Sequence, residues 1–447
     1  MSPKVDLVEH NLPLVAIVGR PNVGKSTLFN RICHKRKAVV HDTPGLTRDR
    51  NFETAEWEGR HFLVVDTGGY DLRPDDSMSE QIREQTLLAI EDADAIIFLT
   101  TVDDTLNPID EDLMSLLRRS GKPVLLAINK CDNVKLKHEA VAFAKFGLEK
   151  LFPISSLHGL GVDNLLDDLL ASLPTKGDQA GEEQAPGIRL AVVGRQNVGK
   201  STLVNSILGE ERVIANPQPG TTRDSIHTTF EREDRRYTII DTAGIRRRGK
   251  IERGIEKLTV LSSLMSLERC DIALVLFDAT AGITEQDAHV AGYAVERGRG
   301  IILIVNKWDA MEKETDTAGT FAKTLRHELA FLEFAPILFL SAKTGQRVHK
   351  IFDLVNEVYP EFTKQIETSE VNEALESFLR KNSPPVRHGR SLKIKYAVQT
   401  AIAPPTFTLF VNDTSLMHFS YRRYLTNKFR ERFGFVGCPI RLRLRKK

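Results

Sequence analysis

Closely spaced cysteines and long apolar runs are both missing from this chain of 447 residues. Its four cysteines, Cys33, Cys131, Cys270 and Cys438, stand far apart, which excludes a dense disulfide framework and a closely spaced pair of metal ligands. The longest apolar runs, such as residues 301–305, are only as long as a strand, and the first residues lack the pattern of a signal peptide. We therefore expect a cytoplasmic protein with reduced cysteines and no membrane span.

Charge is distributed unevenly along the chain. The whole chain has a formal net charge of +2, yet residues 367–447 contain 16 Lys and Arg against 6 Asp and Glu. This last segment therefore carries +10, and the preceding residues carry −8. Such a basic block is consistent with a solvated, solubilising surface, but its concentration in one small segment favours a polyanionic partner.

The chain contains an internal repeat. The decapeptide GRPNVGKSTL at residues 19–28 returns as GRQNVGKSTL at residues 194–203, an offset of 175. The same offset relates the later motifs TRD and DTxG, and it grows to 177 at NKxD and to 186 at a final serine. A nearly constant offset indicates a duplicated domain, with the extra residues of the second copy near the polar stretch 312–319.

The repeat and the composition together divide the chain into segments. Residues 174–187 are rich in Gly, Pro and acidic residues and lack apolar periodicity, which is typical of a flexible linker. We predict an N-terminal tail at 1–11, a first domain at 12–173, the acidic linker at 174–187, a second domain at 188–363 and a basic domain at 364–447.

Short apolar runs alternate with helical patterns in both copies. VAIVG, FLVVD and VLLAINK in the first copy correspond to LAVVG, YTIID and IILIVNK in the second. Strands this apolar are buried on both faces, which indicates a mostly parallel sheet with helices on both sides. The predicted fold class is therefore α/β, with two tandem doubly wound domains.

Each copy begins with the phosphate-binding pattern GxxxxGK[ST], placed between a strand pattern and a helix pattern. Glycines let backbone N–H groups surround a phosphate, the helix N-terminus adds positive potential, and the lysine neutralises phosphate oxygens. We predict that the nucleotide contacts Gly19, Arg20, Pro21, Asn22, Val23, Gly24, Lys25, Ser26 and Thr27 in the first copy and Gly194, Arg195, Gln196, Asn197, Val198, Gly199, Lys200, Ser201 and Thr202 in the second.

The next motifs predict a Mg²⁺ site and a γ-phosphate sensor in each copy. A carboxylate that ends an apolar strand in DT[GA]G lies near the metal, and the glycine that follows allows close approach to the phosphate. The upstream segments read GLTRD and GTTRD, so only their second threonine is common to both. The predicted Mg²⁺ ligands are Ser26, Thr47, Asp66, Ser201, Thr222 and Asp241, and the predicted catalytic residues are Lys25, Thr47, Gly69, Lys200, Thr222 and Gly244.

The motif NKxD selects the base. Its carboxylate can accept hydrogen bonds from N1–H and the amino group of guanine, whereas adenine would leave it unpaired, a difference of roughly 10⁴-fold. GTP is therefore the predicted nucleotide, and the contacts are Asn129, Lys130, Asp132, Ser155, Asn306, Lys307, Asp309 and Ser341.

These motifs resemble those of Era-like GTPases of the translation-factor class. Two such domains followed by a basic domain that ends in FGFVGCPIRLRLRKK resemble the bacterial double-Era-like Der (EngA) family of ribosome-assembly GTPases over nearly the whole chain. The resemblance implies a Mg²⁺-dependent GTPase, monomeric and ribosome-associated, that acts on the large ribosomal subunit and its RNA. It also implies a KH-like α+β fold for the C-terminal domain.

The position that follows DxxG differs from that of Ras-like relatives, where a glutamine orients the attacking water. Tyr70 and Ile245 stand there in this chain. In relatives with a hydrophobic residue here, the resemblance implies a K⁺ ion bound by P-loop asparagines, which are Asn22 and Asn197. The alternative is that both asparagines only support the loop through local hydrogen bonds.

The C-terminal segment predicts the order helix, loop, strand, strand, helix, strand. The tetrapeptide at 434–437, GFVG, matches the GxxG pattern of KH loops, but its middle residues are apolar and it precedes a strand, so we expect a turn. The predicted RNA contacts are Arg422, Arg423, Arg430, Arg432, Arg441 and Arg443.

Three other functions are less consistent with the sequence. A GTPase coupled to tRNA modification is the main alternative, although no second chemical site accompanies the GTPase motifs. Membrane remodelling lacks a span or lipid motif, and a passive regulatory role for one domain conflicts with its full motif set. A basic cluster at 246–250 indicates a second polyanion contact that nucleotide exposes or hides.

Overall fold

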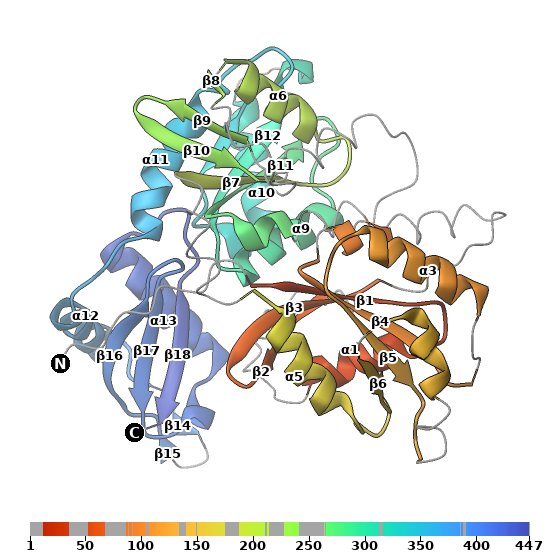
Figure 1. The fold of residues 1–447 in the computed structure, drawn as a ribbon. Coiled ribbons are helices and arrows are strands. Elements are labelled where there is room, and N and C mark those ends of the chain that lie inside the picture. Colours follow the sequence, from red (N-terminus) through yellow and green to blue (C-terminus); the bar gives the residue numbers. More distant parts are fainter. Residues whose placement is uncertain are drawn as a thin grey trace. The chain divides into compact units, whose positions relative to one another are not determined.

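The chain forms two compact units in this computed structural model. One unit contains the first predicted domain, and the other contains the second predicted domain together with the C-terminal one (Figure 1). The structure describes residues 12–34, 52–67, 86–87, 89–91, 93–103, 107–133, 140–148, 150–174, 187–210, 212–213, 228–240, 263, 265–312, 316–384, 386–387 and 390–446. No helix within these ranges is long and apolar enough to cross a membrane.

The first unit is built on a six-stranded sheet in the order β2-β3-β1-β4-β5-β6. β2 pairs antiparallel with β3, and the other described pairs are parallel. The strands are β1 (Leu14–Val18), β2 (Phe52–Trp57), β3 (Arg60–Asp66), β4 (Ala95–Thr101), β5 (Val124–Asn129) and β6 (Leu151–Pro153). The helices are α1 (Lys25–His34), η1 (Ala140–Phe146), α3 (Pro108–Arg119) and α5 (Val162–Ser172).

Both faces of this sheet are covered. Val15 and Ile17 of β1 pack in one core with the apolar sides of α1 and α5. On the opposite face, the ring of Phe98 in β4 meets that of Phe146 in η1 at 6.1 Å between centroids. All five residues of β1 are buried, as the uninterrupted apolar run predicts for a strand between two helical layers. The doubly wound α/β prediction is confirmed.

The second GTPase-like domain repeats this plan with a seven-stranded sheet in the order β13-β12-β11-β7-β10-β9-β8. The strands are β7 (Ile188–Val193), β8 (Arg212–Val213), β9 (Thr228–Arg232), β10 (Arg235–Ile239), β11 (Ile272–Asp278), β12 (Gly300–Asn306) and β13 (Ile337–Phe339). The helices are α6 (Lys200–Glu210), α9 (Glu285–Glu296), η2 (Trp308–Ala310), α10 (Thr317–Glu328), η3 (Ala330–Leu332) and α11 (Lys350–Phe362). The second copy is longer between β12 and β13, where α10 takes the place that the shorter η1 has between β5 and β6 of the first copy.

The C-terminal domain has a three-stranded sheet in the order β16-β17-β18, with two helices on one face (Figure 1). Its elements are α12 (Thr368–Lys381), β14 (Val386–Arg387), β15 (Arg390–Ser391), β16 (Ile394–Ala401), β17 (Thr406–Val411), η4 (Thr414–Leu416), α13 (Phe419–Phe433) and β18 (Arg441–Lys446). The predicted order of main elements is confirmed. The predicted loop differs, because β14 and β15 form a hairpin too short to leave an apolar pattern in sequence.

The C-terminal domain packs directly against the second GTPase-like domain. The N–H of Ile301 in β12 donates to the carbonyl of Gly437 at 2.7 Å, and the N–H of Gly437 donates to the carbonyl of Phe334 at 2.9 Å. Phe435 is fully buried in the same hydrophobic core as Phe362 of α11. The segment 434–437 is therefore a turn that joins the two domains.

Candidate functional site

The two phosphate-binding loops connect β1 to α1 and β7 to α6, at the carboxyl ends of central strands, where α/β sheets bind ligands. Gly24 has φ +97°, and a Cβ on it would lie 2.3 Å from Nδ2 of Asn129. Gly199 has φ +96°, and its Cβ would lie 2.3 Å from Nδ2 of Asn306. Only glycine fits either position, since the backbone is left-handed and a side-chain amide fills the space.

The P-loop lysines point into the loops. Nζ of Lys25 donates to the carbonyl of Arg20 at 2.7 Å. Nζ of Lys200 donates to the carbonyls of Gly194 at 2.8 Å and Arg195 at 2.6 Å. Burial lowers the pKa of Lys25 to about 8, although the nearby carboxylate of Asp66 opposes this shift. Each loop thus holds an ammonium group against its own backbone carbonyls.

Two predicted metal ligands meet in the first site. Oγ of Ser26, at the start of α1, donates to Oδ2 of Asp66, at the end of β3, at 2.6 Å. A hydroxyl and a carboxylate are oxygen ligands of the kind that Mg²⁺ prefers, so the pair fits such an ion. Ser201 occupies the same position at the start of α6. The other residues predicted around the metals and γ-phosphates lie outside the described residues: Thr47, Gly69, Tyr70, Thr222, Asp241, Gly244, Ile245 and the basic cluster 246–250.

The remaining P-loop residues divide by exposure. Val23 and Val198 are fully buried and anchor the loops in the cores. The exposed residues are Pro21, Asn22, Thr27, Gln196, Asn197 and Thr202. Asn22 and Asn197 adopt the left-handed conformation, with φ of 65° and 60°. Both residues are thus exposed to solvent within their loops.

The guanidinium groups of Arg20 and Arg195 lie beside buried carboxylates, and the predicted contacts of these two residues with nucleotide stay a prediction. Nε of Arg20 lies 3.2 Å from Oδ2 of Asp110, and Nε of Arg195 lies 3.3 Å from Oδ2 of Asp287. Neither aspartate belongs to a motif that predicts a role for it. The repeat contained the signal, because they stand at the offset of 177 that also relates the two NKxD motifs.

The asparagines of NKxD tie each P-loop to the loop on the base side. Nδ2 of Asn129 donates to the carbonyl of Val23 at 2.7 Å, and Oδ1 accepts from the N–H of Ser156 at 2.9 Å. In the second site, Nδ2 of Asn306 donates to the carbonyl of Val198 at 2.7 Å, and Oδ1 accepts from the N–H of Ala342 at 2.9 Å. The two sites share this geometry to a tenth of an ångström.

The lysines of NKxD differ in their surroundings. Lys130 pairs with Asp103 at 2.7 Å, and both side chains are about half exposed. Lys307 pairs at 2.6 Å with Asp278, which is only 8% exposed and also accepts from Thr280. Although burial alone would raise the pKa of Asp278, hydrogen bonds from Lys307 and Thr280 bring it below its ordinary value.

The other base-side residues take two different roles. Asp132 and Asp309 are exposed, as an acceptor for an incoming base requires. Ser155 and Ser341 are buried, and their Oγ atoms accept from the N–H groups of His158 and Thr344, each at 3.2 Å. The hydroxyls of these serines therefore stabilise the turns, and backbone N–H groups of the same turns donate to the asparagines.

Three of the six arginines predicted to bind RNA serve the packing of the C-terminal domain. Arg430 lies 4.3 Å from the ring centroid of Phe334 and donates to the carbonyl of Cys438 at 2.8 Å, and burial lowers its pKa to about 10. Arg441 donates to the carbonyl of Glu296, and Arg422 to that of Leu442. The exposed arginines of the set are Arg423, Arg432 and Arg443.

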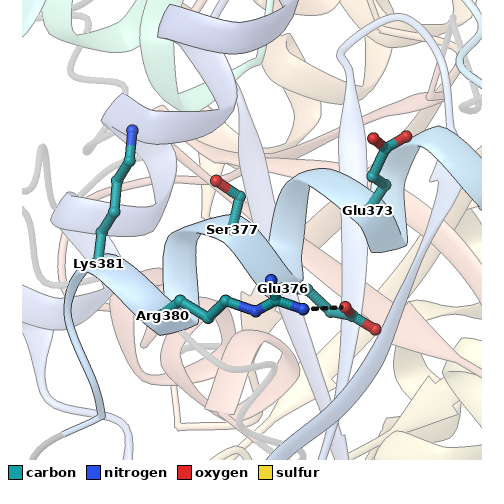
Figure 2. Close-up of a pocket in the computed structure, with 5 residues that line it drawn as sticks. All are labelled: Glu373, Glu376, Ser377, Arg380 and Lys381. Atoms are coloured by element: carbon teal, nitrogen blue, oxygen red, sulfur yellow. Dashed lines mark hydrogen bonds and ion pairs between the residues drawn. The ribbon is translucent and has the colours of Figure 1, made fainter.

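A hollow of about 400 Å³ also lies along α12 (Figure 2). It is lined by Glu373, Glu376, Ser377, Arg380 and Lys381. Its one marked contact, Arg380 to Glu376 at 3.2 Å, is an exposed pair within the helix. Because its charges are mixed and paired locally, the hollow offers no convergent set of groups for a nucleotide.

Comparison with known proteins agrees with this geometry. Residues 14–130 and 189–307 each match a family model described as 50S ribosome-binding GTPase, and residues 365–445 match one described as KH-domain-like of EngA bacterial GTPase enzymes, C-terminal. These descriptions give no support to the tRNA-modification alternative.

Curated relatives match over almost the whole chain. GTPase Der of Geobacter metallireducens is 48% identical over 96% of this chain and 98% of its own length. GTPase Der of Geobacillus kaustophilus is 50% identical over the same shares of the two chains. With two GTP sites of matching construction and this similarity over full length, the chain belongs to the GTPase Der family and hydrolyses GTP.

Proposed function

We propose that this GTPase acts in assembly and maturation of the large ribosomal subunit, through nucleotide-dependent binding to ribosomal RNA or particles. The observation that carries the proposal is that one chain joins two guanine-nucleotide sites of the same construction to a basic domain, which packs on the second site's domain. A family model described as 50S ribosome-binding GTPase matches both GTPase domains, which supports the choice of partner.

The described residues suit GTP hydrolysis by positioning and charge neutralisation. Lys25 and Lys200 would turn from backbone carbonyls to the β- and γ-phosphate oxygens, and Asp132 and Asp309 would accept the guanine N–H groups. Mg²⁺, when bound, would supply positive charge that neutralises the charge developing on the phosphates. The residues proposed to hold it are Ser26, Asp66 and Thr47 in the first site and Ser201, Asp241 and Thr222 in the second.

We also propose that Asn22 and Asn197 take part in binding a K⁺ ion near the phosphates. Both are exposed and hold the left-handed conformation. Turnover should therefore be faster in K⁺ than in Na⁺ at equal ionic strength. Equal rates in the two salts would favour the alternative, in which the asparagines only support the loop.

RNA contacts are proposed for Arg423, Arg432 and Arg443, which are the exposed members of the predicted set. Reversing one such charge should weaken RNA binding and reduce its dependence on salt, because each phosphate contact releases a counterion. Binding that is unaffected by all three reversals would reject this surface. We further propose that the chain acts as a cytoplasmic, ribosome-associated monomer.

Cosedimentation with ribosomal subunits tests the whole proposal. The full chain should associate with the large subunit, and the amount bound should change between GTP, GDP and a non-hydrolysable GTP analogue. Association that is absent or identical in all three states would reject nucleotide-controlled assembly. Cosedimentation with tRNA instead of ribosomal subunits would point to the tRNA-modification alternative.

A further inference from the structure

Each P-loop is tied to a buried carboxylate that lies outside the GTPase motifs. Asp110 belongs to α3, which follows β4, and Asp287 belongs to α9, which follows β11. Both side chains are fully buried, and each lies within about 3 Å of Nε of a P-loop arginine. A buried carboxylate is strongly unfavourable without a cation, so each pair holds its arginine side chain in one place.

The same arginines hold the P-loop lysines through their backbone. The carbonyl of Arg20 accepts from Nζ of Lys25 at 2.7 Å, and the carbonyl of Arg195 accepts from Nζ of Lys200 at 2.6 Å. A buried carboxylate, a guanidinium group, a backbone carbonyl and an ammonium group are thus connected in series in both copies. The series links a helix outside the motifs to the group proposed to contact the phosphates.

We propose that Asp110 and Asp287 are positioning residues for GTP hydrolysis, acting through Arg20 and Arg195. Each carboxylate fixes the arginine at the second position of the P-loop. The backbone carbonyl of that arginine in turn sets the position from which the lysine reaches the phosphates. The inference rests on the proposed role of the P-loop lysines. It is supported twice, because two copies that differ elsewhere place the same pair at nearly the same repeat offset.

The two carboxylates are held by different neighbours. Oδ2 of Asp110 also accepts from the hydroxyl of Thr100 in β4 at 2.6 Å, which connects the first pair to the sheet. Oδ2 of Asp287 accepts from the hydroxyl and the N–H of Thr284 at 2.8 and 3.0 Å, within the capping box of its own helix. The first P-loop can therefore be perturbed through Thr100 without changing a charge.

A double-mutant cycle tests the role of the first pair. The full chain carries Lys200→Ala, so that GTP turnover reports the first site, and Asp110→Asn, Arg20→Gln and their combination are compared. We expect kcat/KM to fall about 10- to 100-fold in each single variant, as displacement of a reacting group by about 1 Å does. The double variant should be no worse than the poorer single one, because both changes break one connection.

Two outcomes of this cycle would overturn the proposal. One is an Asp110→Asn variant that turns over GTP like its parent. The other is a double variant whose loss is the product of the two single losses, which would mean that the carboxylate acts on packing and not through the arginine.

Two controls separate positioning from damage to the fold. In a chain with Lys25→Ala, which reports the second site, Asp110→Asn should leave turnover unchanged, and a fall there would overturn the inference. If Asp110→Asn does not fold, Thr100→Val decides. Loss of one hydrogen bond should lower first-site kcat/KM about 5-fold, and unchanged kinetics would reject the proposal. Undiminished turnover in the chain with both lysines replaced would reject the P-loop assignment itself.

Discussion

Replacing the NKxD asparagines should weaken nucleotide binding by a similar factor in both sites. Asn129→Ala removes the donor to the carbonyl of Val23 and the acceptor of the N–H of Ser156. Asn306→Ala removes the same two hydrogen bonds in the second site, at the same distances of 2.7 and 2.9 Å. In each case one amide joins the loop that surrounds the phosphates to the loop that faces the base.

The magnitude follows from the two backbone groups that each variant leaves behind. Leaving a buried donor or acceptor unsatisfied costs about 1–3 kcal/mol, so two such groups cost about 2–6 kcal/mol. In the free protein the two loops can separate and hydrate these groups, whereas a bound nucleotide holds the loops together. The cost therefore appears in affinity, and at about 1.4 kcal/mol for each factor of ten the loss is at least about 30-fold.

Titration with a fluorescent GDP analogue measures this loss site by site. Lys200→Ala isolates the first site and Lys25→Ala the second. Asn306→Asp is a matched variant, because it keeps the acceptor for Ala342 but sets a carboxylate against the carbonyl of Val198. It should bind more weakly than Asn306→Ala. A loss of affinity below about 3-fold in either site would refute the reasoning, and so would losses that differ by an order of magnitude between the two sites.

Two further predictions compare matched residues. Lys307→Met should lower the free energy of unfolding by about 1–2 kcal/mol, since it leaves the nearly buried carboxylate of Asp278 without its cation. Because hydrogen bonding lowers this carboxyl's pKa from 3.8, the contribution is present above that pH and disappears in acid. Lys130→Met, whose partner is exposed, should change urea unfolding little, and equal effects would contradict this difference. Arg430→Met should lower the melting temperature, whereas Arg432→Met, at an exposed position, should preserve it and reduce the salt slope of RNA binding by about 1. The opposite pattern would reject our division of the arginines.

Features carried by short stretches of sequence could be predicted. Strands such as β1 and β12 are apolar, apart from the Asn306 that ends β12, because both faces are covered. Each P-loop follows one strand and begins one helix. The order of the main C-terminal elements also follows from local periodicity. Gly24 could be expected in a loop of this type, but the sequence alone does not reveal that the Asn129 amide fills the space beside it.

Features that depend on partners distant in sequence could not be predicted. Arg20 stands in a motif that indicates nucleotide contact, yet its side chain meets Asp110, which lies 90 residues away. The number of basic residues in the last segment likewise does not show which arginines face solvent. Arg430 and Arg441 extend over neighbouring backbone and rings, and their burial exists only because the two domains pack together.

Strand β12 connects the second GTP site with the contact to the C-terminal domain. Near the start of β12, the N–H of Ile301 donates to the carbonyl of Gly437. The strand ends in Asn306, whose amide joins the P-loop to the loop that contains Ala342. A buried strand with regular pairing on both edges transmits displacement along its length because close-packed interiors deform little. We therefore expect a nucleotide-driven displacement of Asn306 to reach the contact with Gly437 along β12.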